Sequence, residues 1–433
     1  MEETLAFVMA GGQGERLRPL TDVRSKPAVP FGGIFRIIDF TLSNCINSGL
    51  RRIYVLTQYK SHSLSNHLKS GWNMLSRRLD QFIDEVPAQQ QTGGSWYRGT
   101  ADAIRQNVNF VEENRPRRVL VLSGDHVYKM DYGLLRRFHD EKKASLTVAC
   151  VRVGVEEAAG SFGVMEVDEE ERIVGFEEKP LAPKTLAGGT HCLASMGIYL
   201  FESDCLLKSL AGDHLDFGKD VIPELVRQGV PVYAYDFTRR NRFEEWEYSA
   251  EEGVRRKELV TAASDCDYWR DVGTIEQYWL ANLDLVRPSP KFNVYGERFA
   301  IFSNPGHFPP AKFVHDVPGR AGLAMNSIVA DGVIVSGATV RNSVLGSGVY
   351  VHSYSLVESS VLFGGALRGG YITETDIGRH CRIRNAIIDK NVRLTAGTSV
   401  GYDRADDERR GLKTVPVGDG SEYIVVVPKD CIL

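Results

Sequence analysis

Three glycines and two basic residues follow the first apolar run of the chain, residues 5–10, at a spacing that suits phosphate. They are Gly11, Gly12, Gly14, Arg16 and Lys26. Glycine lets backbone N–H groups approach phosphate oxygens closely, and the two cations add positive charge. The segment therefore predicts a strand that leads into a phosphate-binding loop.

This loop does not match two common nucleotide-binding patterns. The third glycine of G-x-G-x-x-G would fall at Leu17, so the dinucleotide fingerprint is absent, and no Gly-Lys-Ser/Thr completes a Walker A loop. A glycine-rich segment alone is more often an ordinary turn. The presence of Arg16 and Lys26 favours the phosphate site instead.

Four motifs in order resemble the sugar-nucleotide pyrophosphorylase family. The first is GGQGERLRPLT at 11–21 with its Lys-Pro pair at 26–27, and the others are FRIIDF at 35–40, WYRGTADA at 96–103 and GDHVYKMDY at 124–132. The loop alone indicates only the broad family. The three later motifs resemble the branch that makes ADP-glucose, and the similarity runs over nearly the whole chain.

The resemblance implies a reaction in which ATP and α-D-glucose 1-phosphate give ADP-glucose and pyrophosphate, the committed step of glycogen or starch-like glucan synthesis. The sugar phosphate needs no strong base, because a phosphate monoester has a second pKa of about 6. The site must supply positioning and positive charge around the α-phosphorus of ATP. Arg16 and Lys26 are therefore expected to be both nucleotide-binding and catalytic.

Two aspartates are expected to hold Mg²⁺ and to be catalytic. Asp125 follows a Ser-Gly pair at the end of an apolar run, and Asp271 lies in YWRDVGT at 268–274. Mg²⁺ commonly takes one or two protein carboxylates. Taken alone, each aspartate could be a turn residue or a helix cap, Asp271 for a helix that starts near Thr274; the matched motifs favour the metal site. His126 is interpreted as structural.

The site for glucose 1-phosphate is assigned through Glu178 and Lys179, which match the family's E-K-P pattern after a strand pattern at 173–176. Lys179 would neutralise the phosphate, and Glu178 would accept hydrogen bonds from glucose hydroxyls. Without the resemblance, such a charge run is usually solvated surface. Further positions that carry over from the family are Tyr97, Gly163 and Ser195, and Asp216 and Phe217 are expected to line the same pocket.

The resemblance also implies regulation. Relatives are usually homotetramers switched by anionic metabolites that bind where a β-helix meets the catalytic domain. The matching cations are Arg24, Arg36, Arg384, Lys390 and Lys429, and the candidates for coupling the two sites are Gln58 and Trp96.

Two departures from the family bear on the effector. Val23 and Ile34 stand where relatives activated by fructose 1,6-bisphosphate carry lysines, and the chain stops at Leu433 without their basic tail. Lys390 and Lys429 match lysines of relatives that respond to 3-phosphoglycerate. We expect weak activation by the bisphosphate and a better response to a monophosphorylated or carboxylate effector.

Composition and charge argue against a nucleic-acid-binding protein, a membrane protein and a disulfide-rich or zinc-binding protein. A chain of 433 residues predicts two or three domains, and its net charge of −4 provides no basic field for nucleic acid. No leader pattern or membrane-length apolar run stands out, so we expect a cytoplasmic protein without a membrane partner. Seven scattered cysteines without a C-x-x-C pair argue against a zinc site or a disulfide framework.

The periodicity predicts two architectures in succession. To about residue 285, apolar runs alternate with helical patterns, which indicates a doubly wound, mostly parallel mixed α/β sheet of the nucleotidyltransferase type. Strands are expected at 5–10, 53–57, 119–123, 146–151, 197–201 and 232–236, and helices at 101–113 and 132–141. Ligands bind beyond the carboxyl ends of such strands, which would bring the phosphate loop and Asp125 to one site.

Beyond residue 326, apolar residues recur every six positions among Gly and Ser, which predicts a parallel β-helix. An irregular β-sandwich is the alternative from the pattern alone, and the left-handed β-helix of the family decides between them. Residues 366–376 are interpreted as an insertion that bulges from one coil. The expected domains are 1–286 for catalysis, 287–325 as a connector, and 326–433 for regulation and oligomerisation.

Three other functions would each explain part of this sequence. A non-catalytic regulatory subunit would share the fold, but it is expected to lose the metal aspartates or the loop cations, which are present here. A pyrophosphorylase for another sugar nucleotide is the second alternative. A uridylyltransferase fused to a β-helix acyltransferase would explain both halves, but it would need a longer β-helix with a catalytic histidine, and the GDHVYKMDY motif favours ADP-glucose. A nicotinamide-dependent dehydrogenase is excluded mainly by the loop.

Overall fold

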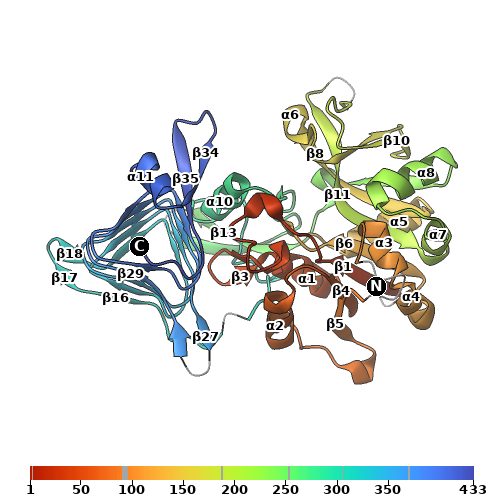
Figure 1. The fold of residues 1–433 in the computed structure, drawn as a ribbon. Helices are drawn as coiled ribbons and strands as arrows, with labels where there is room; N and C mark the ends of the chain where they lie inside the picture. The colour runs from red at the N-terminus through yellow and green to blue at the C-terminus, as the bar shows by residue number, and fades with distance from the viewer. Residues whose placement is uncertain (2, 90–95, 187–188, 252–253, 305, 369–370) are drawn as a thin grey trace. The chain divides into compact units, whose positions relative to one another are not determined.

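The computed structural model describes residues 1, 3–89, 96–186, 189–251, 254–304, 306–368 and 371–433. Contacts between residues divide the chain, drawn as a ribbon in Figure 1, into two compact units. The first comprises Met1–Gly12, Phe40–Trp269 and Tyr295–Ile301, and the second comprises Gln13–Asp39, Arg270–Val294 and Phe302–Leu433. Most of the phosphate loop and Asp271 therefore belong to the same unit as the C-terminal repeats.

A mixed α/β sheet forms the centre of the first unit, as predicted. Its strand order is β10-β9-β11-β6-β1-β4-β5, with β8 beside β11 and β12 beside β8. The pairs β6-β1, β1-β4 and β4-β5 are parallel, whereas β11 runs antiparallel to β6 and β8. The strands are β1 (Thr4–Met9), β4 (Arg52–Thr57), β5 (Phe82–Pro87), β6 (Arg118–Ser123), β8 (Leu146–Gly154), β9 (Gly163–Val167), β10 (Ile173–Glu178), β11 (His191–Glu202) and β12 (Val232–Asp236).

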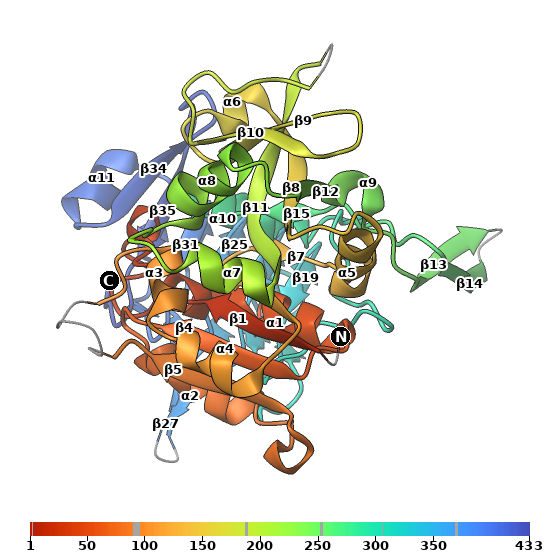
Figure 2. The same cartoon turned by 90° about the vertical axis from the view of Figure 1, so that its right-hand side faces the viewer.

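Helices cover the sheet and bury both faces of its central strands. Every residue of β1 from Thr4 to Val8 is buried, although successive side chains point to opposite faces. Figure 2 shows α3, α4 and α7 on the near face, where Leu5 and Phe7 share a core with Ile104 of α3. The helices are α2 (His62–Gly71), α3 (Thr100–Arg105), α4 (Val108–Asn114), α5 (Tyr132–Glu141), α6 (Val155–Ala158), α7 (Ser203–Ser209), α8 (Ile222–Arg227) and α9 (Phe237–Arg240).

The single helix expected at 101–113 is wrong, because the chain forms α3 and α4 instead. Asn107 lies between them with a non-helical φ of −119° and ψ of 22°. Its side-chain amide donates to the Ala103 carbonyl at 2.8 Å and to the Tyr97 hydroxyl at 2.9 Å. These bonds give the backbone an alternative to a continuous helix. The helix predicted at 132–141 is confirmed as α5.

Three ladders of short parallel strands form the repeats of the second unit, which confirms the predicted parallel β-helix. Their orders are β16-β21-β24-β29-β32, β19-β22-β25-β30-β33 and β20-β23-β26-β31-β35. Ile328 aligns with Val344, and Val361 aligns with both Val344 and Ile387, as the sequence repeat indicated. Successive strands along the chain join successive ladders, so each coil adds one strand to every ladder.

The coils turn at asparagines and are filled by aliphatic residues. Asn326, Asn342 and Asn385 occupy equivalent corners with φ of 46°, 47° and 48°, a left-handed conformation that asparagine tolerates better than most residues. The strands are β16 (Lys312–Val314), β19 (Leu323–Met325), β20 (Ile328–Val329), β21 (Ile334–Ser336), β22 (Thr339–Arg341), β23 (Val344–Leu345), β24 (Val349–Val351), β25 (Leu356–Glu358), β26 (Val361–Leu362), β29 (Thr375–Ile377), β30 (Arg382–Arg384), β31 (Ala386–Ile388), β32 (Arg393–Leu394), β33 (Ser399–Val400) and β35 (Glu422–Val427).

Four further elements interrupt or follow the coils. The insertion predicted at 366–376 is an antiparallel hairpin of β27 (Ala366–Arg368) and β28 (Tyr371–Thr373), and its last residues belong to β29. Residues 369–370 lie outside the described part. After the last coil come α11 (Arg404–Arg409) and β34 (Lys413–Val417), which pairs antiparallel with β35.

The limits predicted for the three domains stay predictions. The strands β16 and β19 fall inside the segment expected to be a connector, and α10 (Ile275–Asp284) falls inside the segment expected to be catalytic. No helix in the described ranges is long and apolar enough to cross a bilayer.

Candidate active site

The phosphate loop begins where β1 ends. A Cβ at Gly11 would lie 3.1 Å from the Gln58 Cβ, whereas one at Gly12 would meet nothing within 4 Å among the described residues. Gly14 has a φ of 64°, and its carbonyl accepts a hydrogen bond from the Thr21 hydroxyl at 2.9 Å. The loop thus needs glycine at 14 for its conformation and at 11 for a close approach, while position 12 is open.

Both predicted loop cations lie beside one carboxylate, that of Asp271. The Lys26 ammonium donates to Asp271 Oδ1 at 2.9 Å and to the Asp271 carbonyl at 2.8 Å. The Arg16 guanidinium lies 3.7 Å from Asp271 Oδ2. The Lys26 side chain is 7% exposed and that of Arg16 is 65% exposed, so Lys26 is fixed while Arg16 reaches into solvent.

The backbone after Asp271 is strained. Val272 has a φ of 46°, which is rare for a β-branched residue, and its side chain is buried. Such strain persists where surrounding structure imposes it, often at functional sites. The cap of α10 is Thr274, whose hydroxyl accepts from Gln277 N–H at 3.2 Å. The interpretation of Asp271 as that helix cap is therefore wrong.

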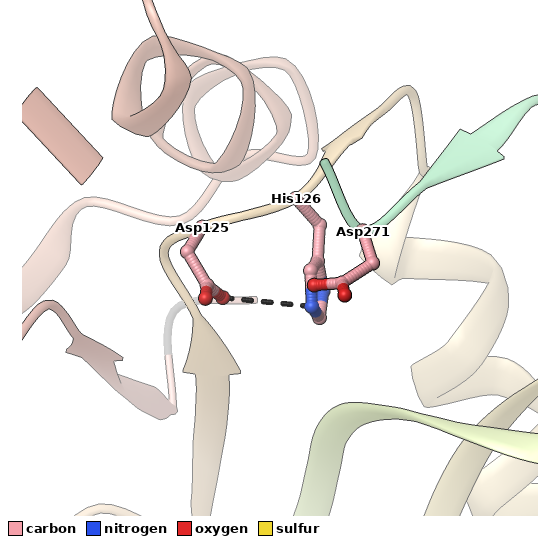
Figure 3. A group of neighbouring side chains, drawn as sticks. All are labelled: Asp125, His126 and Asp271. Carbon is pink, nitrogen blue, oxygen red and sulfur yellow. Dashed lines mark ion pairs between the residues drawn. The ribbon is translucent and has the colours of Figure 1, made fainter. Parts of the chain in front are cut away.

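Asp125 follows the carboxyl end of β6, where Gly124 N–H donates to the Met9 carbonyl at 3.0 Å. The Ser123 hydroxyl donates to Asp125 Oδ1, and His126 Nε2 lies 3.5 Å from the same oxygen (Figure 3). The His126 ring also packs edge-on against Trp269, with centroids 5.1 Å apart. The loop after β6 thus holds its aspartate in a defined position.

Asp125 and His126 of the first unit and Asp271 of the second each offer a side chain that could ligate a metal ion (Figure 3). Carboxylate oxygens are the ligands that Mg²⁺ prefers, whereas imidazole suits transition metals. Two aspartates therefore fit Mg²⁺, and the packing of His126 on Trp269 agrees with the structural role expected of it.

The residues expected to bind the sugar phosphate lie on adjacent strands. Glu178 ends β10 directly opposite Gly163, the first residue of β9. A Cβ at Gly163 would lie 2.6 Å from the Phe176 ring and 2.7 Å from Glu178 Oε2, so a larger residue there would displace the ring or the carboxylate. Lys179 follows with a φ of 53°, and its N–H donates to the Phe162 carbonyl at 3.1 Å.

One further acid, Asp216, and the Tyr199 phenol interact electrostatically with Glu178. Burial raises the pKa of Glu178, and the charge of Asp216 raises this pKa further. Asp216 caps the π-helical turn η4 (Phe217–Val221) by accepting from Gly218 N–H at 2.9 Å. The Ser195 hydroxyl lies 3.5 Å from the hydroxyl of Tyr199, which raises no sequence signal of its own.

Tyr97, one of the predicted sugar residues, is hydrogen-bonded to Gln58 and directly follows Trp96, the two coupling candidates. Its hydroxyl accepts from the Asn107 amide at 2.9 Å, and its carbonyl accepts from the Gln58 amide at 3.5 Å. Burial raises the pKa of its phenol. Trp96, the preceding residue, is 54% exposed. Gln58 thus contacts both Gly11 and the segment that carries Trp96.

Four of the five predicted effector cations act on one another. Burial, together with the like charges of Arg36, Arg24 and Lys429, lowers the pKa of Lys390 to about 7. The fifth cation, Arg384, packs on an aromatic ring, with its guanidinium 4.8 Å from the centroid of Tyr402.

The sequence interpretation missed the acid that accompanies these cations. Arg24 donates to both carboxylate oxygens of Asp389 at 2.9 Å, and Lys390 N–H donates to Asp389 Oδ1 at 2.6 Å. Its position directly before Lys390 was the available signal, but an acid beside a lysine is usually surface. Thr100 and Val272 carried no signal, because their roles depend on distant contacts or on the backbone.

Comparison with known proteins identifies both halves of the chain. Residues 5–287 match the family model described as nucleotidyl transferase, and residues 309–419 match the one described as GlmU-like, C-terminal hexapeptide. Glucose-1-phosphate adenylyltransferase 2 of Pseudoalteromonas atlantica is 45% identical over 96% of this chain and 93% of its own length.

Two further relatives cover similar lengths. Glucose-1-phosphate adenylyltransferase of Shewanella oneidensis is 45% identical over 99% of this chain and 96% of its own, and that of Alteromonas mediterranea is 44% identical over 96% and 91%. Because these relatives are 44 or 45% identical over nearly the whole chain and the nucleotidyl transferase model matches residues 5–287, the chain belongs to the glucose-1-phosphate adenylyltransferase family of nucleotidyl transferases.

Proposed function

We propose that this chain transfers the adenylyl group of ATP to the phosphate of α-D-glucose 1-phosphate, giving ADP-glucose and pyrophosphate. The observation that carries the proposal is the 45% identity over nearly the whole chain to proteins named for this activity. The reaction is the committed step of glycogen synthesis, and we assign it to the cytoplasm.

The chemistry asks for charge and position rather than for a base. An oxygen of the sugar phosphate attacks the α-phosphorus of ATP, a new P–O bond forms, and the bond to the β-phosphate breaks. Because the second pKa of a phosphate monoester is about 6, the nucleophile is largely a dianion at neutral pH. No side chain has to accept a proton, and the protein has to align two anions and stabilise the transition state.

The loop cations would act on the nucleotide. Lys26 is held 2.9 Å from Asp271 and is nearly buried, so water screens its charge weakly. Arg16 is exposed and can follow the incoming phosphates. Asp125 and Asp271 would hold Mg²⁺, which supplies further positive charge to the ATP phosphates when bound. Lys26 and Asp271 would thus place a positive charge for the ATP phosphates directly beside a carboxylate for the metal ion.

Strands β9 and β10 would present the sugar site. Lys179 would bind the phosphate of glucose 1-phosphate, and Glu178 would accept hydrogen bonds from glucose hydroxyls. Gly163 leaves the space that the Glu178 carboxylate occupies, and Ser195, Tyr97, Asp216 and Phe217 would complete the pocket.

Regulation would take place at the cations around Lys390. An anionic metabolite there would relieve the repulsion among Arg24, Arg36, Lys390 and Lys429, which act on one another electrostatically. We further propose a homotetramer, which sedimentation or light scattering of the purified protein would test.

Pyrophosphate release tests the proposed activity. Purified protein, glucose 1-phosphate and Mg²⁺ are combined with ATP, UTP, CTP or dTTP in parallel, and mass spectrometry identifies the product. Release with ATP that requires the sugar phosphate, with ADP-glucose as product, supports the proposal. Faster release with another nucleotide indicates a different sugar nucleotide, and no release with any of them from folded protein indicates a regulatory subunit.

A further inference from the structure

The hydroxyl of Thr100 joins two segments that lie 116 residues apart in the first unit. It donates to Asp216 Oδ2 at 3.0 Å and accepts from Phe217 N–H at 3.1 Å. A hydroxyl can donate once and accept at the same time, so one group satisfies both the acid and the turn that follows it.

The backbone around Thr100 is held independently of this hydroxyl. The N–H groups of Ala101 and Asp102 donate to the Leu215 carbonyl at 2.9 and 3.1 Å. A Cβ at Gly99 would clash with the same carbonyl, so the close approach of the two segments depends on glycine there. Removing only the hydroxyl would therefore leave the two segments docked and take away one of the bonds that orient the Asp216 carboxylate.

The orientation of Asp216 matters because it lies beside Glu178. Its other carboxylate oxygen accepts from Gly218 N–H at 2.9 Å and from Lys219 N–H at 3.2 Å. Gly218 itself packs against the Glu178 carboxylate so tightly that a Cβ would clash with it. Asp216 and the turn that it caps thus form one wall beside Glu178.

We infer that the Thr100 hydroxyl is a positioning group for the sugar site, because it fixes Asp216 and the first turn of η4 beside Glu178. The inference rests on the proposed function and adds a residue that sets affinity for the sugar phosphate. Thr100 acts through Asp216, and the ATP phosphates bind elsewhere, at the loop after β1. Its contribution is therefore specific to one of the two substrates.

Two matched variants separate the hydroxyl from the shape of the side chain. Thr100→Val keeps the shape and loses the hydroxyl, and Thr100→Ser keeps the hydroxyl. We expect Thr100→Val to raise KM for glucose 1-phosphate about tenfold, as for the loss of a hydrogen bond to a charged group, and to change KM for ATP less than about twofold. Thr100→Ser should restore the wild-type value, with melting temperatures alike throughout.

A double-mutant cycle with Asp216→Asn tests whether Thr100 acts through that acid. In the Asp216→Asn background, Thr100→Val should change KM for glucose 1-phosphate much less than in the wild type. Where the valine variant does not fold, Thr100→Ala takes its place.

An unchanged KM for glucose 1-phosphate in Thr100→Val, equal changes in both KM values, or full additivity in the cycle would overturn the inference. A wild-type protein that makes no ADP-glucose would instead contradict the proposed function, so the two failures are distinguishable.

Discussion

Arg24 and Asp389 form a buried bidentate ion pair across 365 residues of chain, with both N–O distances at 2.9 Å. Arg24 also donates to the Leu20 carbonyl at 3.1 Å. The pair fixes the segment between the glycines and Lys26 to the coil that carries Lys390. An anion bound at Lys390 would thereby act on the same segment that supplies the loop cations.

Effector binding should depend on pH through Lys390. Its pKa is about 7 in the folded protein, against an ordinary value of 10.5, because of burial and the neighbouring Arg36 and Arg24, which Asp389 only partly offsets. An anion favours the charged form, so binding takes up a proton above pH 7. The half-activating concentration of pyruvate, whose charge is constant here, should rise between pH 7 and 8.5, by at most about tenfold per pH unit.

Lys390→Arg provides the matched control for this pH dependence, because arginine stays charged over the whole range. Its half-activating concentration should be nearly independent of pH. A flat profile in the wild type would show that Lys390 does not titrate at the effector site.

The effector itself should be a monophosphate or a carboxylate. Val23 and Ile34 remove two cations that relatives activated by fructose 1,6-bisphosphate possess, whereas Lys390 and Lys429 are present. Initial rates with fructose 1,6-bisphosphate, fructose 6-phosphate, 3-phosphoglycerate and pyruvate should show the weakest activation by the bisphosphate. Lys390→Ala should lose the response, and strong preference for the bisphosphate would refute this prediction.

Two substitutions should separate the substrates. Lys179→Ala should raise KM for glucose 1-phosphate and leave KM for ATP nearly unchanged, because in the proposed site Lys179 would bind a phosphate that is present before and during the reaction. Arg16→Ala should do the reverse. Since Lys179 has a φ of 53°, Lys179→Gln controls for any effect of alanine on the backbone. A Lys179 variant impaired chiefly for ATP would contradict the assignment.

Asp125→Asn should lower kcat by on the order of 10² to 10³, the loss typical of a group that stabilises charge in the transition state. The two KM values should change far less. Ser123→Ala is a useful companion, because it removes only the hydroxyl that donates to Asp125 Oδ1. If Asp125→Asn keeps more than about half of the wild-type kcat at saturating Mg²⁺, then another carboxylate binds the metal.

The sequence by itself determined the fold class and the family. The phosphate loop, the Gly-Asp pair after β6 and the E-K-P pattern are local, so their chemistry is visible in short runs of residue types. The spacing of Ile328, Val344 and Val361 likewise predicted the coils, because each coil must bury the same positions against the next.

Only the tertiary structure decided which distant side chains meet. Asp271 and Thr100 lie within recognisable motifs and Asp389 stands beside Lys390, but nothing in these short runs shows which distant side chain each one meets. The Lys26 ammonium donates to Asp271 across 245 residues of chain, and the Arg24 guanidinium donates to Asp389 across 365 residues. The Thr100 hydroxyl donates to Asp216 across 116 residues. These pairings follow from the path of the whole chain through both architectures, which no local pattern of residue types encodes.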